Sequence, residues 1–234
     1  MVRALLDGRK TQTRRVLKAA VPEAPAMDAI VHEPKHPAPY LDAYCSAERQ
    51  SLHNPRGMGT NWCWWTRDDR CGPQFKVGYA PGDLLWVRET FSFIGGDGVF
   101  ELSQARMTGR YEPLYRADEG TTADRWWSSI HMPREFSRLT LTVTGVRVER
   151  LQAISEEDCV AEGAFVQSPR PYDHGQVFVH RDPDETWHSM TPRAWYHELW
   201  DSINGAGAWD ANPWIVALTF SVAKRNIDAM RVAA

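Results

Sequence analysis

The stretch RLTLTVTGVRVERL at 138–151 constrains the fold more than any other part of this chain. As far as Val143, apolar residues alternate with threonines, which is the period of a β-strand with one buried face. From Val146 onward the valines continue on the opposite parity. A change of phase at Thr144 and Gly145 predicts a bulge or sharp bend, as found where a small barrel turns a corner.

Other segments carry start and stop signals for regular structure. A short helix is expected after the N-cap Ser155, with Asp158 in a capping box, Ile154 and Cys159 as a hydrophobic staple, and Gly163 as the stop. A longer helix is expected from Thr191 and Pro192 to Gly205. We expect its buried face to hold Trp195, Tyr196, Leu199, Trp200 and Ile203. The remaining expected elements are a helix over 1–8 and strands over 84–93, 113–116 and 214–222.

The order helix, strands, two helices, strand predicts an α+β fold, namely a small mixed β-barrel with flanking helices and long loop insertions. Regular βαβ alternation, internal repeats and Gly-rich phosphate-binding motifs are missing from the sequence. We expect a single domain over 1–234, with insertions at about 19–81 and 165–190. The NWCWW run at 61–65 should anchor the first insertion.

Composition narrows the class of protein and of partner. The formal net charge is −3 and the pI about 6.2, so no partnership with duplex DNA is expected, although the first eighteen residues are locally basic. The sequence has four cysteines without a CxxC pair, and it shows neither a signal peptide nor a long apolar run. These features predict a cytoplasmic protein with reduced thiols and no membrane partner.

The segment GRKTQTRR at 8–15 holds the first candidate chemistry. A tight turn there would bring Lys10 beside Thr13, and a desolvated lysine can activate a hydroxyl. The alternative is a solvated basic loop. Glu162 falls at the C-terminal end of the short helix, where the helix dipole disfavours a carboxylate. It is therefore either a solvated surface residue or a buried group, held by a cation, that is suited to proton transfer.

Two further sites remain open. In a strand, Trp86 and Arg88 share one face, and Glu89 lies on the other. These charges either hold a polar ligand at the barrel mouth or form an internal ion pair. Arg134 could bind a phosphate and His131 could titrate near neutral pH, or both could belong to a turn that leads into the strand at 138–151. Cys45, His53, Cys63 and Cys71 are residue types that can bind zinc. The spacings between them match no familiar zinc finger, so no zinc site is predicted.

Four segments together resemble the ASCH domain family: GRKTQTRR at 8–15, PGDLLWVRE at 81–89, LTLTVTGVRVERLQAISEEDCVAEGA at 139–164 and NPWIVALTF at 212–220. The likeness is strongest to the longer ASCH proteins of phages and prophages. It implies a PUA-like β-barrel whose cleft binds RNA or a nucleoside.

The resemblance also implies an activity. Small bacterial relatives with the GRKT-x-T signature hydrolyse the amide of N4-acetylcytidine with a lysine, a threonine and a glutamate, which correspond here to Lys10, Thr13 and Glu162. Thr13 is then the expected nucleophile, Lys10 its base, and Glu162 the group that orients Lys10 or moves the proton. The expected substrate-binding residues are Arg14, Arg15, Trp86, Arg88, Glu89, His131 and Arg134.

No metal or organic cofactor is needed for this reaction. The alternatives are a ribonuclease of single-stranded RNA using Lys10, Arg15 and His131, or a noncatalytic RNA-binding module. A phage accessory protein that keeps the fold without activity is a third reading.

Overall fold

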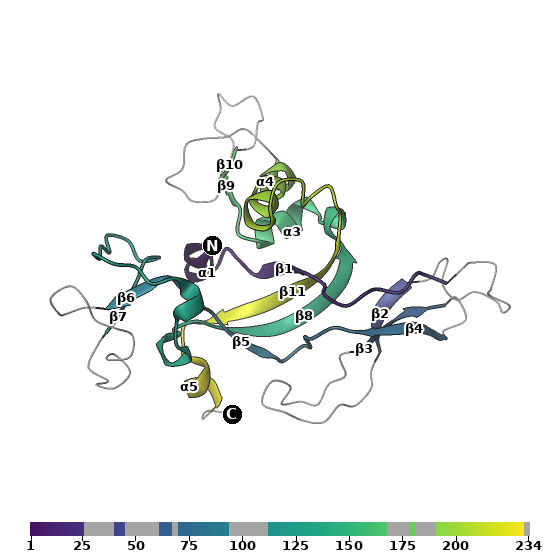
Figure 1. Ribbon diagram of the computed structural model, residues 1–234, viewed down its shortest axis with the longest axis horizontal. Helices are drawn as coiled ribbons and strands as arrows, with labels where there is room; N and C mark the ends of the chain where they lie inside the picture. Colours follow the sequence, from purple (N-terminus) through teal and green to yellow (C-terminus); the bar gives the residue numbers. More distant parts are fainter. Residues whose placement is uncertain are drawn as a thin grey trace.

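The computed structural model describes residues 1–25, 40–44, 61–66, 70–93, 112–167, 178–180 and 191–231. Its centre is a four-stranded sheet in the order β1-β11-β8-β5, formed by β1 (Gln12–Val16), β5 (Leu84–Trp86), β8 (Thr140–Arg150) and β11 (Trp214–Ala223). Every pairing in it is antiparallel. The long strands β8 and β11 curl across the middle of the molecule, so the sheet forms half of a barrel (Figure 1). The α+β class is confirmed.

The bend predicted inside the long strand lies where β8 pairs with β11. Thr219 is opposite Gly145 and Phe220 is opposite Val143, which leaves Thr144 as an extra residue. Val143 is buried and Thr144 is exposed. The predicted bulge is therefore confirmed, and it increases the local twist of the sheet.

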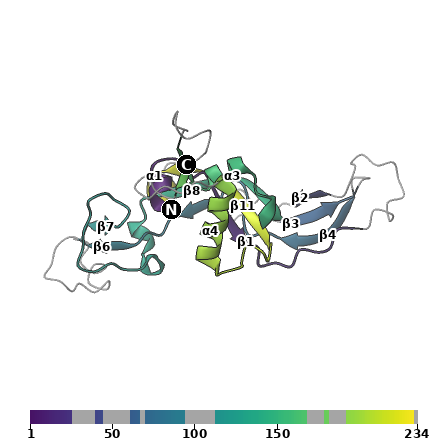
Figure 2. The same cartoon turned by 90° about the horizontal axis from the view of Figure 1, so that it is seen from above.

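Two helices pack together on one side of the sheet, α3 (Glu156–Ala161) and α4 (Pro192–Asn204) (Figures 1 and 2). The N-cap of α3 is confirmed, since Ser155 Oγ accepts a hydrogen bond from the Asp158 N–H at 3.1 Å. The staple residues Ile154 and Cys159 are both buried in the core beneath α4. The short helices α1 (Val2–Leu6) and α5 (Ile227–Arg231) lie near the other end of β11.

The longer helix begins as predicted, with Thr191 Oγ1 accepting from the Ala194 N–H at 3.2 Å. Its buried residues are Trp195, Tyr196, Leu199 and Trp200. The prediction for Ile203 is wrong, because this side chain is 64% exposed. Ile203 has the helical spacing of the buried residues, but it falls in the last turn of α4, where its side chain extends past the core that covers the other four.

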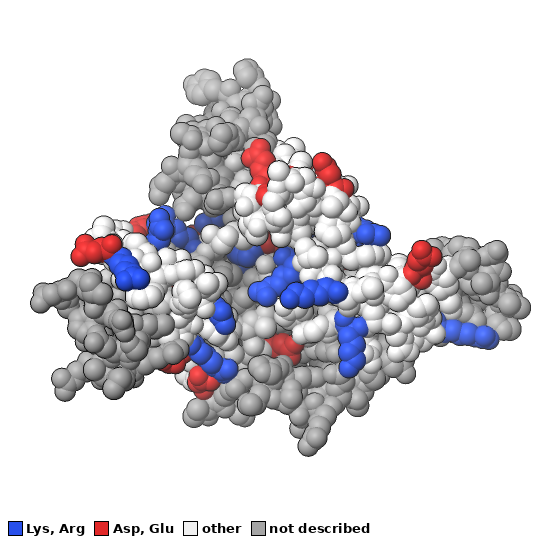
Figure 3. Space-filling view, viewed as in Figure 1, with Lys and Arg blue, Asp and Glu red and all other residues white. Residues whose placement is uncertain are grey.

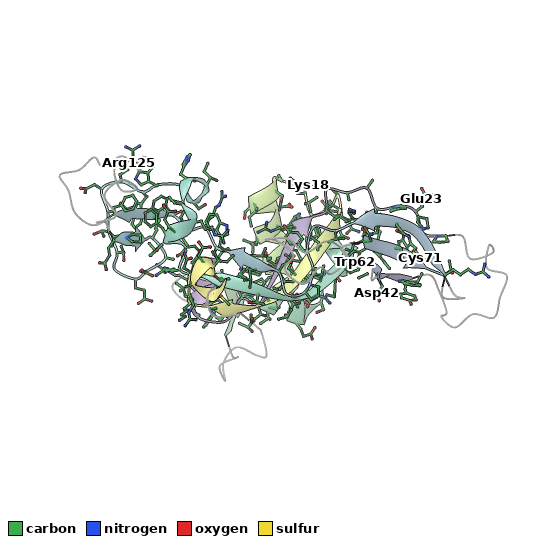
Figure 4. All side chains as sticks on the ribbon, turned by 90° about the horizontal axis from the view of Figure 1, so that it is seen from below. Lys18, Glu23, Asp42, Trp62, Cys71 and Arg125 are labelled. Carbon is green, nitrogen blue, oxygen red and sulfur yellow. The ribbon has the colours of Figure 1, made fainter. Side chains whose placement is uncertain are left out.

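The first insertion contains a three-stranded antiparallel sheet at one end of the molecule, in the order β2-β3-β4 (Figures 1 and 2). Its strands are β2 (Tyr40–Tyr44), β3 (Asn61–Trp65) and β4 (Cys71–Lys76). Trp62 is 5% exposed and packs with Val148, Val216 and Leu218 of the central sheet. It lies where the small sheet meets the central strands (Figure 4), so the anchoring role of NWCWW is confirmed.

The prediction of a single strand over 84–93 is wrong. The structure has two short strands, β5 and β6 (Phe91–Phe93), and β6 pairs with β7 (Pro113–Tyr115) at the opposite end of the molecule (Figure 2). Between them the chain leaves the central sheet, because the carboxylate of Glu89 is buried against Arg138 and its N–H contacts Met132 Sδ at 3.0 Å.

The remaining elements are small. Three 3₁₀ turns flank β8, namely η2 (Ser129–His131), η3 (Arg134–Phe136) and η4 (Leu151–Ala153). In the second insertion β9 (Phe165–Gln167) pairs with β10 (Phe178–His180). Among the described residues, no helix combines the length and the apolar character needed to cross a membrane.

Candidate active site

The segment 9–11, which links α1 to β1, is held at the C-terminal end of α3. Three successive carbonyl groups of that end accept hydrogen bonds from it. The Thr11 N–H donates to Ala161 O at 2.8 Å, Lys10 Nζ to Glu162 O at 2.9 Å, and Arg9 Nη1 to Gly163 O at 3.0 Å. These carbonyls lack partners within the helix, and the dipole favours cations there. The turn itself lies at Asp7 and Gly8, ahead of Lys10, and the strand begins at Gln12.

Gly163 permits this close approach. Its φ is +106°, a conformation that glycine adopts without the strain that a side chain would cause. A Cβ at this position would lie 3.0 Å from Ala4 Cβ and 3.3 Å from Lys10 Cβ. The glycine that ends α3 therefore also makes room for the stem of the lysine.

Lys10 and Glu162 form a buried ion pair. Lys10 Nζ lies 2.5 Å from Glu162 Oε2, and the two residues are 5% and 2% exposed. Burial lowers the pKa of the Lys10 ammonium below its ordinary value of 10.5, although the Glu162 carboxylate opposes this shift. The Tyr196 hydroxyl also donates to Glu162 Oε1, at 3.4 Å. Glu162 is thus the buried carboxylate held by a cation, and the solvated alternative is excluded.

Arg14 approaches Glu162 from its other side, and both of its terminal nitrogens are paired with carboxylates. Its guanidinium is fully buried and contacts three carboxylates: Glu162 at 3.2 Å, Glu149 at 3.2 Å and Asp158 at 2.6 Å. Burial alone would lower the pKa of Arg14, but Glu162 and the neighbouring carboxylates hold it above its ordinary value. The structure therefore places Arg14 among the groups that support Glu162.

Asp158 and Tyr196 are members of this network that the sequence did not reveal. Asp158 was assigned to a capping box, but its carboxylate binds the guanidinium groups of Arg14 and Arg147, both at 2.6 Å. Burial would raise the pKa of Asp158, yet these two arginines hold it below its ordinary value. Tyr196 was predicted only as core, which it is, and burial raises the pKa of its phenol.

A cleft of about 610 Å³ opens beside the ion pair. It runs over the central sheet, with Thr13 and Arg15 from β1, Trp86 from β5 and Arg88 just after it. Six residues of the predicted site line it, namely Lys10, Thr13, Arg15, Trp86, Arg88 and Arg134. The other lining residues are Leu5, Tyr79, Leu84, Leu85, Val87, Leu141, Phe220 and Ile227. Lys10 and Thr13 thus both line the same cleft.

The described lining of this cleft is cationic. It contains four Lys and Arg residues and no Asp or Glu. On the face seen in Figure 3, Lys and Arg side chains gather in a band across the middle of the molecule, whereas acidic side chains lie mainly around it. Such a lining favours an anionic or strongly polar ligand.

Three of these cations are already held in place. Arg88 stacks on the Trp86 ring at 4.7 Å and donates to Ile130 O at 3.2 Å. Arg15 Nη1 donates to the Tyr79 hydroxyl at 3.3 Å. Arg134 differs from both, because its guanidinium is paired with Asp228 at 2.6 Å.

Besides Arg14, two predicted binding residues lie outside the described lining of the larger cleft. Glu89 is 1% exposed, and both of its oxygens accept hydrogen bonds from Arg138, at 3.1 and 2.9 Å. Of the two alternatives for Glu89, the structure therefore supports the internal ion pair. His131 is exposed in η2. Trp86 and Arg88 both line the cleft, as does Val87 between them, and Arg88 stacks on the Trp86 ring although β5 ends at Trp86.

A smaller cleft of about 270 Å³ lies on the α4 side of β1. Thr13 and Arg15 line it as well as the larger cleft, and Glu162 and Tyr196 form part of its wall. Among the described residues, no group of three His, Cys, Asp or Glu could hold a metal ion. Cys45 and His53 lie outside these residues.

Comparison of the chain with protein-family models, with curated proteins and with solved structures finds no match.

Proposed function

We propose that this chain is a PUA-like protein of the ASCH type that hydrolyses the amide bond of an N4-acylated cytidine. The observation that carries the proposal is the buried Lys10–Glu162 pair, whose lysine shares a cleft with Thr13. A lysine whose pKa is lowered by burial can accept a proton from a hydroxyl at a lower pH than a solvated lysine can. The motifs of the ASCH family assign the same three residues.

In the proposed reaction Thr13 Oγ attacks the amide carbonyl carbon, and its proton passes to neutral Lys10 Nζ. The tetrahedral intermediate then collapses as the C–N bond breaks, and Lys10 returns the proton to the leaving exocyclic nitrogen. Water next attacks the acyl-threonine ester, with Lys10 taking the water's proton and then giving it to Thr13 Oγ. Glu162 orients the Lys10 amine throughout, and Arg14 and Tyr196 keep Glu162 in place.

The cleft suits a substrate of this size and chemistry. Its volume lies within the range of pockets that hold small organic ligands, about 300–1,000 Å³. Trp86 and the stacked Arg88 offer flat surfaces for a base. Arg15 is two residues from Thr13 on the same strand and lines the cleft, where its charge favours an anionic part of the substrate.

The cationic lining also favours a second candidate, a binding module for single-stranded RNA without catalysis. A ribonuclease receives less support, because the exposed His131 lies outside the described lining and so does not supply the expected acid or base. A measurement of turnover distinguishes the hydrolase from the noncatalytic binding module.

The test is deacetylation of N4-acetylcytidine and of a short RNA that contains it, followed by chromatography. We expect release of acetate from at least one substrate, and a loss of about 10²-fold or more in Lys10→Met and Thr13→Val. Lys18→Met is the matched control, because Lys18 is exposed and outside the described lining (Figure 4). Equal activity in Lys10→Met, or intact substrates with the wild-type protein, would reject the hydrolase.

A further inference from the structure

Within the described residues, two arginines of the cleft, Arg15 and Arg88, have no acidic partner, and they lie at different ends of it. Arg15 pairs with Val216, which is opposite Val148 of β8. Trp86, on whose ring Arg88 stacks, pairs with Thr140 of the same strand. Eight residues along a straight strand span about 26 Å. The curl of β8 shortens this distance, but the two ends of the strand remain well apart (Figure 1). A single phosphate is therefore too small to bridge both arginines.

The reactive residues lie between these two ends. Thr13 pairs with Leu218, which is opposite Val146 of β8. The carbonyl of Thr11, next to Lys10, accepts from the N–H of Phe220 at 2.9 Å, and Phe220 is opposite Val143. Along the sheet, the order is Arg15, then Thr13 and Lys10, then Trp86 with Arg88.

Both arginines keep an uncompensated charge. Arg15 donates only to the Tyr79 hydroxyl and Arg88 only to the Ile130 carbonyl, and neither has a carboxylate partner in the described part of the chain. By contrast, the other arginine of the cleft, Arg134, is neutralised by Asp228. An arginine that is held by a neutral acceptor and faces a cleft retains N–H groups for a phosphate.

We propose that the substrate carries phosphate groups on both sides of the reacting nucleoside, with Arg15 binding one and Arg88 the other. This inference rests on the proposed function for the position of the reacting base. Phosphates on both sides are the chemistry of a nucleotide inside a single strand, and of a free nucleoside 3′,5′-bisphosphate. A free nucleoside would leave both arginines without a partner.

The test measures binding, so that it does not depend on turnover. Calorimetry on Thr13→Val would compare cytidine, cytidine 5′-monophosphate, cytidine 3′,5′-bisphosphate and a cytidine-centred trinucleotide. We expect affinity to rise about tenfold with each phosphate, because a charge-assisted hydrogen bond is gained each time. Arg15→Met and Arg88→Met should each remove one of these two steps. Tighter binding of the trinucleotide than of the bisphosphate would identify a strand as the source of the phosphates, and equal binding the free bisphosphate.

Arg125→Met is the matched control. Arg125 also stacks on a tryptophan, Trp127, at 4.3 Å, but it lies at the far end of the molecule, outside the described lining (Figure 4). Salt gives a second readout: the logarithm of the trinucleotide affinity should fall with a slope of about −1.4 against log salt, and about −0.7 in either variant.

Equal affinity for cytidine and its bisphosphate would overturn the inference, even if the hydrolase is active. The two-ended assignment would also be wrong if affinity rises from cytidine to the monophosphate but not from the monophosphate to the bisphosphate, and if only one of the two arginine variants loses this rise. If the phosphate steps appear but no acetylated substrate is cleaved, the hydrolase fails and the phosphate sites stand.

Discussion

Among single residues, Lys10 has the least ordinary surroundings. Its ammonium group is buried beside one carboxylate, and a guanidinium lies on the far side of that carboxylate. Burial disfavours the charged form of lysine, while Glu162 favours it. The net direction is a lowered pKa, which is the property that the proposed base requires.

This direction has a consequence for stability that can be measured. Unfolded Lys10 keeps its proton up to about pH 10.5, whereas folded Lys10 loses it at a lower pH. Between these two pKa values the unfolded state binds more protons, so the Lys10 contribution to the free energy of unfolding rises with pH. Lys10→Met removes the contribution.

Buried phenols such as Tyr196, whose pKa is raised, have the opposite slope at alkaline pH. The informative quantity is therefore the difference between wild type and Lys10→Met, from urea titrations across pH 7 to about 10. We expect this difference to move in favour of the wild type as pH rises. A difference that stays constant or shrinks would contradict a lowered pKa for Lys10.

Among the elements, α3 is short but carries much of the site. The carbonyl groups at its C-terminal end hold the segment 9–11, and its Asp158 contacts Arg14. The signals for this helix are local, which is why they could be found in the sequence. The partner of its C-terminal end is the N-terminal turn, about 150 residues away, and no local signal reveals that.

Gly163→Ala tests this contact. We expect a loss of about 1–3 kcal/mol in the free energy of unfolding, together with reduced activity, because the new Cβ meets Ala4 and the stem of Lys10. Gly205→Ala is the control: its φ is +104°, close to the +106° of Gly163, and nothing lies within 4 Å of the position of its Cβ. Equal losses for the two variants would show that only backbone strain matters.

For the whole molecule, the small β2-β3-β4 sheet and the central half-barrel share a core. Trp62 contributes to that core from one side, and Val148, Val216 and Leu218 from the other. The insertion is therefore part of the folded unit where Trp62 packs, and not a separate appendage.

Trp62→Ala should lower the free energy of unfolding by about 3–5 kcal/mol, the usual cost of removing a large buried aromatic side chain. Trp65→Ala in the same strand is the comparison, because Trp65 is only partly buried and stacks on Tyr40 at 6.5 Å. Urea unfolding followed by circular dichroism measures both. A smaller loss for Trp62→Ala than for Trp65→Ala would argue against a shared core.

The sequence by itself determined the features that depend on neighbouring residues. The bulge at Thr144, the cap at Ser155, the start of α4 at Thr191 and its end at Gly205 all follow from local backbone and side-chain chemistry. Periodicity also placed most of the buried face of α4, and it failed for Ile203 because exposure depends on what lies opposite.

Only the tertiary structure decided which charged residues work together. The sequence offered four arginines as equivalent ligands for a sugar, a phosphate or an oxyanion. Folding buries Arg14 against three carboxylates, pairs Arg134 with Asp228, and leaves Arg15 and Arg88 facing the cleft. The physical reason is that an ion pair depends on distance in space, and the partners here are separated by up to about 150 positions in the chain.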